Sequence, residues 1–264
     1  MGSADVQGPL WGAEAEKWSR IQEPHHRPLF AAMLTAAGIE PGMHVLDVGC
    51  GGGFSSRLAI EHGARVTGLD AAKGMIDYAR SAVPEGEFHV GDMENMSFED
   101  HSFDVVFAGN SVQYAGDLVS ALREFGRVCE PGGRIVAGLF GAPEKVAFKA
   151  VFGALQQVAP PPPPGTRPGG PFALSEPGLL AAKFEQAGLR VTATGEADCP
   201  FRYPNFDEFY LGAVRAPGPG QHLLQHVDEQ TLRSTVEAAA RPFTAQDGSI
   251  TIQPNVFVYV VGTP

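Results

Sequence analysis

The chain has 264 residues, of which 44% are hydrophobic and 19% charged, and 30 acidic residues against 19 basic ones give a formal net charge of −11. This composition is typical of a folded globular protein and excludes wholesale disorder. The acidic balance argues against a surface that follows nucleic-acid phosphates, because such a surface needs clustered Lys and Arg. A small-molecule partner is therefore favoured over a nucleic acid.

No apolar run approaches the roughly 18 residues needed to span a bilayer. The stretch Met1–Gly12 lacks the basic and apolar regions of a secretory signal. We therefore expect a cytoplasmic protein with no membrane partner. Cys50, Cys129 and Cys199 are widely separated, and no pair has the C-x-x-C spacing of a thiolate metal site. We expect reduced thiols and no bound metal.

Strands and helices alternate through the first half of the chain. Residues 11–38 are predicted to be helical, with interruptions at Pro24 and Pro28, and the apolar run His44–Val48 is typical of a buried strand. The elements predicted next, in chain order, are helix 54–62, strand 64–69, helix 72–81, strand 87–90, strand 103–108, helix 118–128 and strand 134–139. This alternation indicates an α/β fold, doubly wound, in which helices cover both faces of a mostly parallel sheet.

The alternation weakens after residue 140. The predicted elements of this part are helices at 144–158, 175–188, 206–214 and 231–240, and strands at 189–194 and 255–261. Five consecutive prolines at positions 160–164 cannot form regular helix or central strand. They belong either to an inert exposed loop or to a lid over a pocket.

A glycine-rich loop follows the first predicted strand. Gly49 and Gly51 begin it where strand turns into helix, so the backbone can approach a ligand closely. A dinucleotide fingerprint, G-x-G-x-x-G, would need glycine at position 54, which is Phe54. Asp70 ends the next strand, where its carboxylate can accept hydrogen bonds from both hydroxyls of a ribose. Together these features indicate a ligand of the adenosine type.

Two further signals lie downstream. Asp92 follows the third strand, where its carboxylate can meet an adenine amino group, and Pro131-Gly132-Gly133 makes a tight turn before the fifth strand. The four motifs, in order, are VLDVGCGGG, GLDAAKGMIDYAR, GDMENMSFEDHSFDVVFAGNSVQY and EFGRVCEPGGRIV. Over about residues 40–140 this set resembles the class I S-adenosylmethionine-dependent methyltransferases, particularly those that methylate small molecules.

The resemblance implies a Rossmann-like sheet of seven strands with the last strand inserted antiparallel. It also implies S-adenosylmethionine as the cofactor and S-adenosylhomocysteine as the product. On the methionine side, Gly49 and Gly51 would lie against the cofactor, and Asp47 would position the loop beneath the amino group. Asn110 and Gln113, at the end of the fourth strand, would close this side.

On the adenosine side, the resemblance implies that Asp70 holds the ribose hydroxyls. Ala71 and Met75 would sit beside the adenine, and Asp92 and Met93 would contact its edge and face. Core packing is an equally good interpretation of Met75 and Met93.

In related enzymes an N-terminal segment often folds over the cofactor, and variable additions choose the substrate. By this resemblance we expect an N-terminal helical lid segment at residues 1–40, then a cofactor-binding domain at 41–264 with a cap insertion at about 141–219. Many aromatic residues in these additions favour an apolar or planar acceptor, although packing of cap against core would use the same residues.

Methyl transfer to O, N, C or S is an in-line displacement that needs mainly orientation and a dry pocket. A base is required only when the acceptor must lose a proton. The candidate catalytic residues are His25 and His26, which could equally be surface histidines, and Tyr114, which could orient the acceptor or simply pack. His222 and His226 are interpreted as part of a solvated helix face, since no zinc pattern accompanies them.

Other functions fit less well. A nucleic-acid methyltransferase would carry prolines after Asn110 and basic stripes, and an NAD-dependent oxidoreductase would need glycine in place of Phe54. A protein that binds the cofactor without transferring methyl, as a cyclase, regulator or scaffold, stays open because fold does not determine function. We expect a monomer or homodimer that acts on a small-molecule acceptor.

Overall fold

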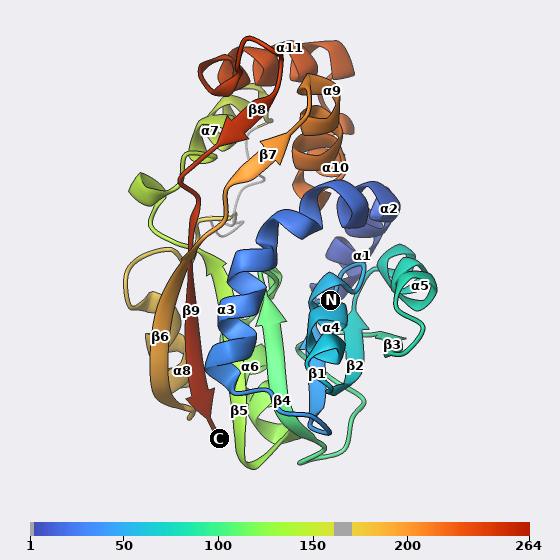
Figure 1. Cartoon of the computed structure of the whole chain (residues 1–264), viewed down its shortest axis with the longest axis vertical. Coiled ribbons are helices and arrows are strands. Elements are labelled where there is room, and N and C mark those ends of the chain that lie inside the picture. Colours follow the sequence, from blue (N-terminus) through green and yellow to red (C-terminus); the bar gives the residue numbers. More distant parts are fainter. Residues whose placement is uncertain (1–2, 161–170) are drawn as a thin grey trace.

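The computed structural model describes residues 3–160 and 171–264. At its centre is a seven-stranded sheet in the order β3-β2-β1-β4-β5-β9-β6 (Figure 1). Its strands, in chain order, are β1 (His44–Val48), β2 (Arg65–Asp70), β3 (Glu87–Val90), β4 (Phe103–Gly109), β5 (Cys129–Phe140), β6 (Arg190–Asp198) and β9 (Val256–Thr263). The first five pair in parallel, and β9 runs antiparallel between β5 and β6. The predicted doubly wound, mostly parallel sheet is confirmed.

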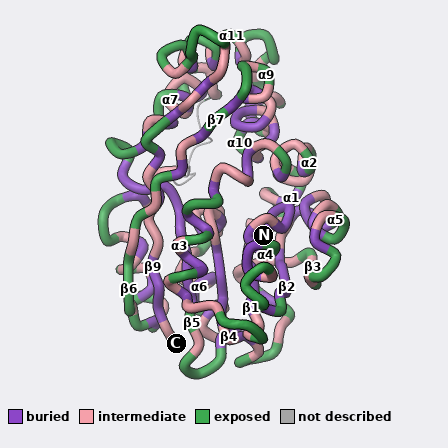
Figure 2. Tube along the Cα trace, viewed as in Figure 1, coloured by how far each residue is buried: buried purple, intermediate pink, exposed green. Residues whose placement is uncertain are grey.

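Helices cover both faces of this sheet. On the face turned toward the viewer in Figure 1 lie α3 (Arg27–Ala37) and α4 (Phe54–Glu61), and behind the sheet lie α6 (Leu118–Val128) and α8 (Leu179–Gln186). A fifth helix, α5 (Lys73–Ala82), packs against β2 and β3. The middle strands are therefore buried, whereas β6 at one edge is largely exposed (Figure 2).

The helix α6 illustrates how the sequence dictates this packing. Asp117 caps its start by accepting hydrogen bonds from the N–H groups of Val119 and Ser120. Leu122 and Phe125 recur on one helix face and are fully buried against the sheet. Burial of each side chain contributes about 1.5–3 kcal/mol, so this apolar face fixes the orientation of the helix.

The N-terminal segment is helical from its first described residues. It consists of α1 (Ala4–Gly12), α2 (Ala15–Lys17), a π-helix η1 (Trp18–Gln22) and a 3-10 helix η2 (Glu23–His26) before α3. The predicted helix at 11–38 starts too late, because Gly8 and Pro9 lie inside α1 and weaken its local signal. Tertiary contacts hold this helix instead, since Gly8 packs directly against the backbone of Ala71.

A cap rises above the carboxyl ends of the strands, at the top of Figure 1. We define it as residues 143–158 and 201–252. It contains η4 (Pro143–Lys145), α7 (Lys149–Val158), β7 (Phe201–Tyr203), α9 (Phe206–Phe209), the π-helix η5 (Tyr210–Arg215), α10 (Gly218–Leu224), α11 (Glu229–Ala240), η6 (Arg241–Phe243) and β8 (Ile250–Ile252). Strands β7 and β8 pair antiparallel.

The range 141–219 was expected to form one cap insertion. In the structure, part of it belongs to the cap and part of it to the main sheet. Between the two stretches of the cap, α8 and β6 complete the main sheet, and the cap continues well beyond residue 219. The predicted helix at 175–188 begins at Leu179, after Pro177 and Gly178. Of the five prolines, those at 161–164 lie outside the described residues. The three cysteines are buried free thiols.

Candidate active site

The loop after β1 requires glycine at two positions. Gly49 and Gly51 both have positive φ, at 70° and 53°. A Cβ on Gly49 would overlap the side chain of Ser111, and a Cβ on Gly51 would lie 2.5 Å from Glu23 Oε1. The backbone of this loop therefore lies closer to its neighbours than any other residue would allow.

Asp70, at the end of β2, is held by the same loop. Its Oδ2 accepts a hydrogen bond from the Gly51 N–H at 2.9 Å, and its Oδ1 accepts one from the Ala72 N–H at 2.8 Å. Burial raises the pKa of this carboxyl, and the two N–H groups partly offset that effect. Each oxygen keeps a further lone pair, so the carboxylate is fixed in place and still able to accept two ligand hydroxyls.

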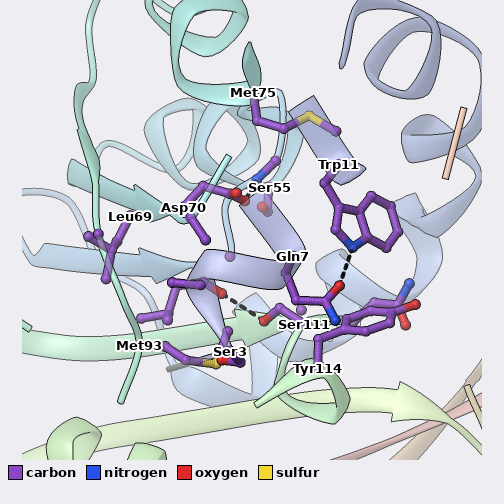
Figure 3. A pocket seen from close by; sticks show the side chains of 18 of the residues that line it. Ser3, Gln7, Trp11, Ser55, Leu69, Asp70, Met75, Met93, Ser111 and Tyr114 are labelled. Atoms are coloured by element: carbon purple, nitrogen blue, oxygen red, sulfur yellow. Dashed lines mark hydrogen bonds between the residues drawn. The ribbon is translucent and has the colours of Figure 1, made fainter. Parts of the chain in front are cut away.

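Most of the residues predicted to contact the cofactor line one pocket at the carboxyl ends of the strands (Figure 3). They are Gly49, Gly51, Asp70, Ala71, Met75, Asp92, Met93 and Asn110. The candidate catalytic residues His26 and Tyr114 line the same pocket. We call the glycine loop, Asp70 and Asp92 the floor of this pocket.

Asp47, Gln113 and His25 lie behind the residues that line the pocket. Asp47 Oδ2 accepts hydrogen bonds from Ser55 Oγ at 2.7 Å and Ser56 Oγ at 2.6 Å, which ties β1 to the start of α4. Burial raises the pKa of Asp47 to about 6. The Nε2 group of Gln113 donates to Asn110 Oδ1 at 2.8 Å.

His25 belongs to the contact between the N-terminal segment and the cap. Its Nε2 lies 2.8 Å from the Arg202 carbonyl oxygen, and its ring packs 4.7 Å from that of Tyr203. Tyr203 in turn donates a hydrogen bond to Gln22 Oε1 at 2.5 Å. His25 therefore joins the N-terminal segment to the cap.

His26, by contrast, is buried in the pocket wall as a neutral imidazole. Its Nδ1 lies 3.2 Å from the Glu23 carbonyl and its Nε2 3.3 Å from Asn110 Nδ2, so Nδ1–H donates and Nε2 accepts. Burial, with a smaller effect from His25, lowers the pKa of His26 to about 3. Asn110 has a left-handed backbone, φ 56°, which is uncommon for a residue other than glycine and is typical of constrained sites.

An aromatic roof, which we define as α1, η1 and η2, closes the pocket from above. The ring centroid of Trp11 lies 4.9 Å from that of Trp18 and 5.2 Å from that of Tyr114. Figure 3 shows Trp11 beside Gln7, which accepts its Nε1–H at 3.1 Å. Burial raises the pKa of Tyr114 to about 12, so its phenol stays neutral and serves packing or hydrogen bonding.

The start of α1 is tied by one carboxylate to the loop that follows β3. Glu94 Oε2 accepts hydrogen bonds from Ser3 Oγ at 2.6 Å and from the Ser3 N–H at 3.2 Å. Further along α1, a Cβ on Gly8 would lie 2.6 Å from the Ala71 carbonyl oxygen. The helix is therefore held against Ala71 and Glu94 at the edge of the pocket.

Comparison with known proteins identifies this arrangement. Residues 46–137 match the family model described as a methyltransferase domain. This segment is similar to the class I S-adenosylmethionine-dependent methyltransferases. The crystal structure of the YcgJ protein from Bacillus subtilis shares the fold, with a TM-score of 0.59 and 23% identity over 90% of this chain and 99% of that chain.

Two curated relatives resemble this segment in sequence. A malonyl-[acyl-carrier protein] O-methyltransferase from Serratia marcescens is 40% identical over 110 residues, 42% of this chain and 43% of that protein. A demethylmenaquinone methyltransferase from Beutenbergia cavernae is 35% identical over 122 residues, 46% of this chain and 51% of that protein. The chain thus matches about half or less of the length of these relatives.

The charged residues that line the pocket are all acidic. Glu23, Asp70 and Asp92 line it, and none of the described lining residues is Lys or Arg. In residues 3–160 and 171–264 no three His, Cys, Asp or Glu side chains are grouped to hold a metal ion. Within the same ranges no helix is long and apolar enough to cross a membrane. A pocket lined by acidic but not basic side chains suits a cationic organic ligand.

Sequence reasoning missed the parts of the pocket that come from the roof. The missed lining residues of the roof are Ala4, Gln7, Trp11, Trp18 and Glu23, and Ser3 precedes them at the N-cap of α1. Trp11 lies in α1 and Trp18 in η1, so no single helix periodicity could have found them together. The cap contributes no residue to the described pocket lining. Its aromatic residues, such as Phe148, Phe201 and Phe209, pack in one apolar cluster.

Proposed function

We propose that the protein transfers a methyl group from S-adenosylmethionine to an O, N, C or S atom of a small apolar or aromatic metabolite. The observation that carries this proposal is the composition of the pocket. Its floor presents Asp70 with both oxygens fixed by backbone N–H groups, and its roof presents the indoles of Trp11 and Trp18. One side therefore suits a nucleoside and the other an apolar acceptor.

The residues present fit the cofactor. Asp70 would hold the ribose hydroxyls, and Gly49 and Gly51 would let the methionine part approach the backbone. Asp92, whose Oδ1 is fixed by the Glu94 N–H at 2.9 Å, would accept from the adenine amino group through its other oxygen. Met93 would lie beside the adenine ring.

The chain would contribute orientation and exclusion of water. When bound, S-adenosylmethionine supplies a methyl group on a positively charged sulfur, ready for in-line displacement. Trp11, Trp18 and Tyr114 would hold a planar acceptor and keep the pocket dry, which in favourable systems is worth up to about 7–11 kcal/mol of the barrier. A neutral His26 with its Nε2 already hydrogen-bonded to Asn110 is a poor proton acceptor, so we assign it a positioning role.

The relatives' acceptors, malonyl-[acyl-carrier protein] and demethylmenaquinone, guide the choice of substrates to test. The family model ends at residue 137 and begins at residue 46, so it omits the roof. Because the roof supplies the aromatic wall, we favour a planar acceptor over an acyl thioester.

The test is an acceptor screen with methyl-labelled S-adenosylmethionine. The panel holds naphthoquinols and phenols, malonyl-[acyl-carrier protein], and small highly charged amines and acids. We expect label, and a mass increase of one CH2 unit, in planar apolar acceptors. Turnover confined to the small charged acceptors would contradict the proposal. Cofactor binding without any methylated product would favour a protein that binds the cofactor for another purpose.

A further inference from the structure

Glu23 is a buried carboxylate with one oxygen that lacks a hydrogen-bond partner among the described residues, although the backbone N–H groups of Gly52 and Phe54 interact with the carboxyl group. It lies in η2, is 5% exposed and lines the pocket. Its Oε2 accepts no hydrogen bond from the described residues. Leaving a buried carboxylate oxygen without a partner is costly, and such groups in native proteins call for an explanation, such as a ligand.

The glycine loop leaves room for this carboxylate. A Cβ on Gly51 would lie 2.5 Å from Glu23 Oε1, and a Cβ on Gly52 would lie 3.0 Å from Oε2. A larger residue at position 51 would push Glu23 away from the loop, and one at position 52 would first overlap the side chain of Ser19. The glycines thus allow a side chain of the roof to reach the floor next to β1.

Three carboxylates consequently follow one another along the carboxyl edge of the sheet. Asp92 follows β3, Asp70 ends β2, and Glu23 lies on the loop that follows β1, in the sheet order β3-β2-β1. An extended S-adenosylmethionine carries its hydrogen-bond donors in a matching order: the adenine amino group, the ribose hydroxyls and the ammonium of the amino-acid end. Building on the proposed function, we propose that Glu23 binds this ammonium group.

The electrostatics of the pocket support this assignment. Burial raises the pKa of Glu23 well above its ordinary value, repulsion from Asp47 and Asp70 raises it further, and the N–H groups of Gly52 and Phe54 act in the opposite direction. With no Lys or Arg among the described lining residues, an ammonium group would supply the missing positive charge. Asp47 Oδ1 also lacks a partner, but Asp47 lies outside the lining.

The decisive experiment compares two ligands that differ only at the amino-acid end. S-adenosylhomocysteine carries the ammonium, whereas 5′-methylthioadenosine keeps the adenine, ribose and sulfur but has no amino-acid end. Calorimetric titration of Glu23→Gln should show about 10- to 100-fold weaker binding of S-adenosylhomocysteine, the size expected for one charged hydrogen bond. Binding of 5′-methylthioadenosine should change less than about twofold, which also shows that the variant is folded.

The matched control is Glu16→Gln, the same substitution at an exposed position of the same segment. It should leave both affinities unchanged. Glu23→Asp keeps the charge on a side chain that is one methylene shorter. It should weaken S-adenosylhomocysteine binding by less than Glu23→Gln does, and it should leave 5′-methylthioadenosine binding unchanged. This variant also serves if Glu23→Gln does not fold.

The other outcomes separate the competing explanations. Equal weakening of both ligands would overturn the proposal and make Glu23 a structural support of the loop and of the start of α4. Unchanged binding of both ligands would overturn it as well. Failure of folded wild-type protein to bind either ligand would refute the proposed function itself, which is a different result from the loss of selectivity between the two ligands.

Discussion

The floor and the roof of the pocket are built in different ways. The floor comes from neighbouring strands, and Asp70 is held by backbone N–H groups of Gly51 and Ala72, at most 19 positions away. The roof depends on contacts between distant parts of the chain: Ser3 with Glu94, 91 positions away, and Gln22 with Tyr203, 181 positions away. Contacts with nearby residues fix the floor, whereas contacts between distant parts of the chain hold the roof. Affinity should therefore depend mainly on the floor, and ligand exchange mainly on the roof.

The largest effect should follow from removing the floor's central carboxylate. Asp70→Ala should weaken S-adenosylhomocysteine binding by at least about 100-fold, because two charge-assisted hydrogen bonds are lost. Isothermal titration calorimetry measures this change. The exposed Asp77→Ala on α5 is the control and should bind like wild type. A loss of less than about threefold at Asp70 would show that the floor does not govern affinity.

A second effect concerns stability and pH at the base of the floor. Burial raises the pKa of Asp47 from 3.8 to about 6. In the folded protein Asp47 therefore stays protonated up to a higher pH than in the unfolded chain. The ligand-free wild type should therefore lose about 2 kcal/mol of stability, relative to Asp47→Asn, as the pH rises from 4 to 8. Urea denaturation at several pH values measures this difference. Parallel pH profiles for the two proteins would mean that folding does not raise the pKa of Asp47.

The third effect belongs to the roof. Gly8→Ala places a Cβ 2.6 Å from the Ala71 carbonyl oxygen and should lift α1 from the floor. We expect faster hydrogen exchange in α1 and about tenfold weaker S-adenosylhomocysteine binding, since overpacking of this kind costs at least about 1 kcal/mol. Gly153→Ala in α7 is the control, because its Cβ would meet nothing within 4 Å. Unchanged exchange in α1 would show that the roof does not depend on this contact.

The smallest effect lies between roof and cap. Tyr203→Phe removes the hydrogen bond to Gln22 Oε1 and should cost about 1 kcal/mol of stability, measured by urea denaturation. Binding of S-adenosylhomocysteine should weaken by less than in Gly8→Ala, because the cap supports the roof without lining the pocket. Tyr78→Phe on α5, whose hydroxyl forms no hydrogen bond with the described residues, is the matched control. If Tyr203→Phe and Tyr78→Phe were equally stable, the hydrogen bond of Tyr203 would contribute nothing measurable to stability.

The same contrast explains what the sequence can and cannot predict. The alternation of strands and helices and the pocket positions Gly49 and Asp70 follow from local patterns, because the floor is made where strands end and their following loops begin. Glu23 has no local signal, since its role depends on how η2 lies over the glycine loop. Strands β7 and β8, of three residues each, are too short for a periodicity and form only because the cap brings them together.

The most direct test of the account is calorimetric titration of folded wild-type protein with S-adenosylhomocysteine. A pocket with a fixed Asp70, an anionic lining and an aromatic roof should bind one molecule per chain with micromolar affinity. Absence of measurable binding at millimolar ligand, to protein whose circular dichroism shows the α/β fold, would contradict the assignment of this pocket to the cofactor.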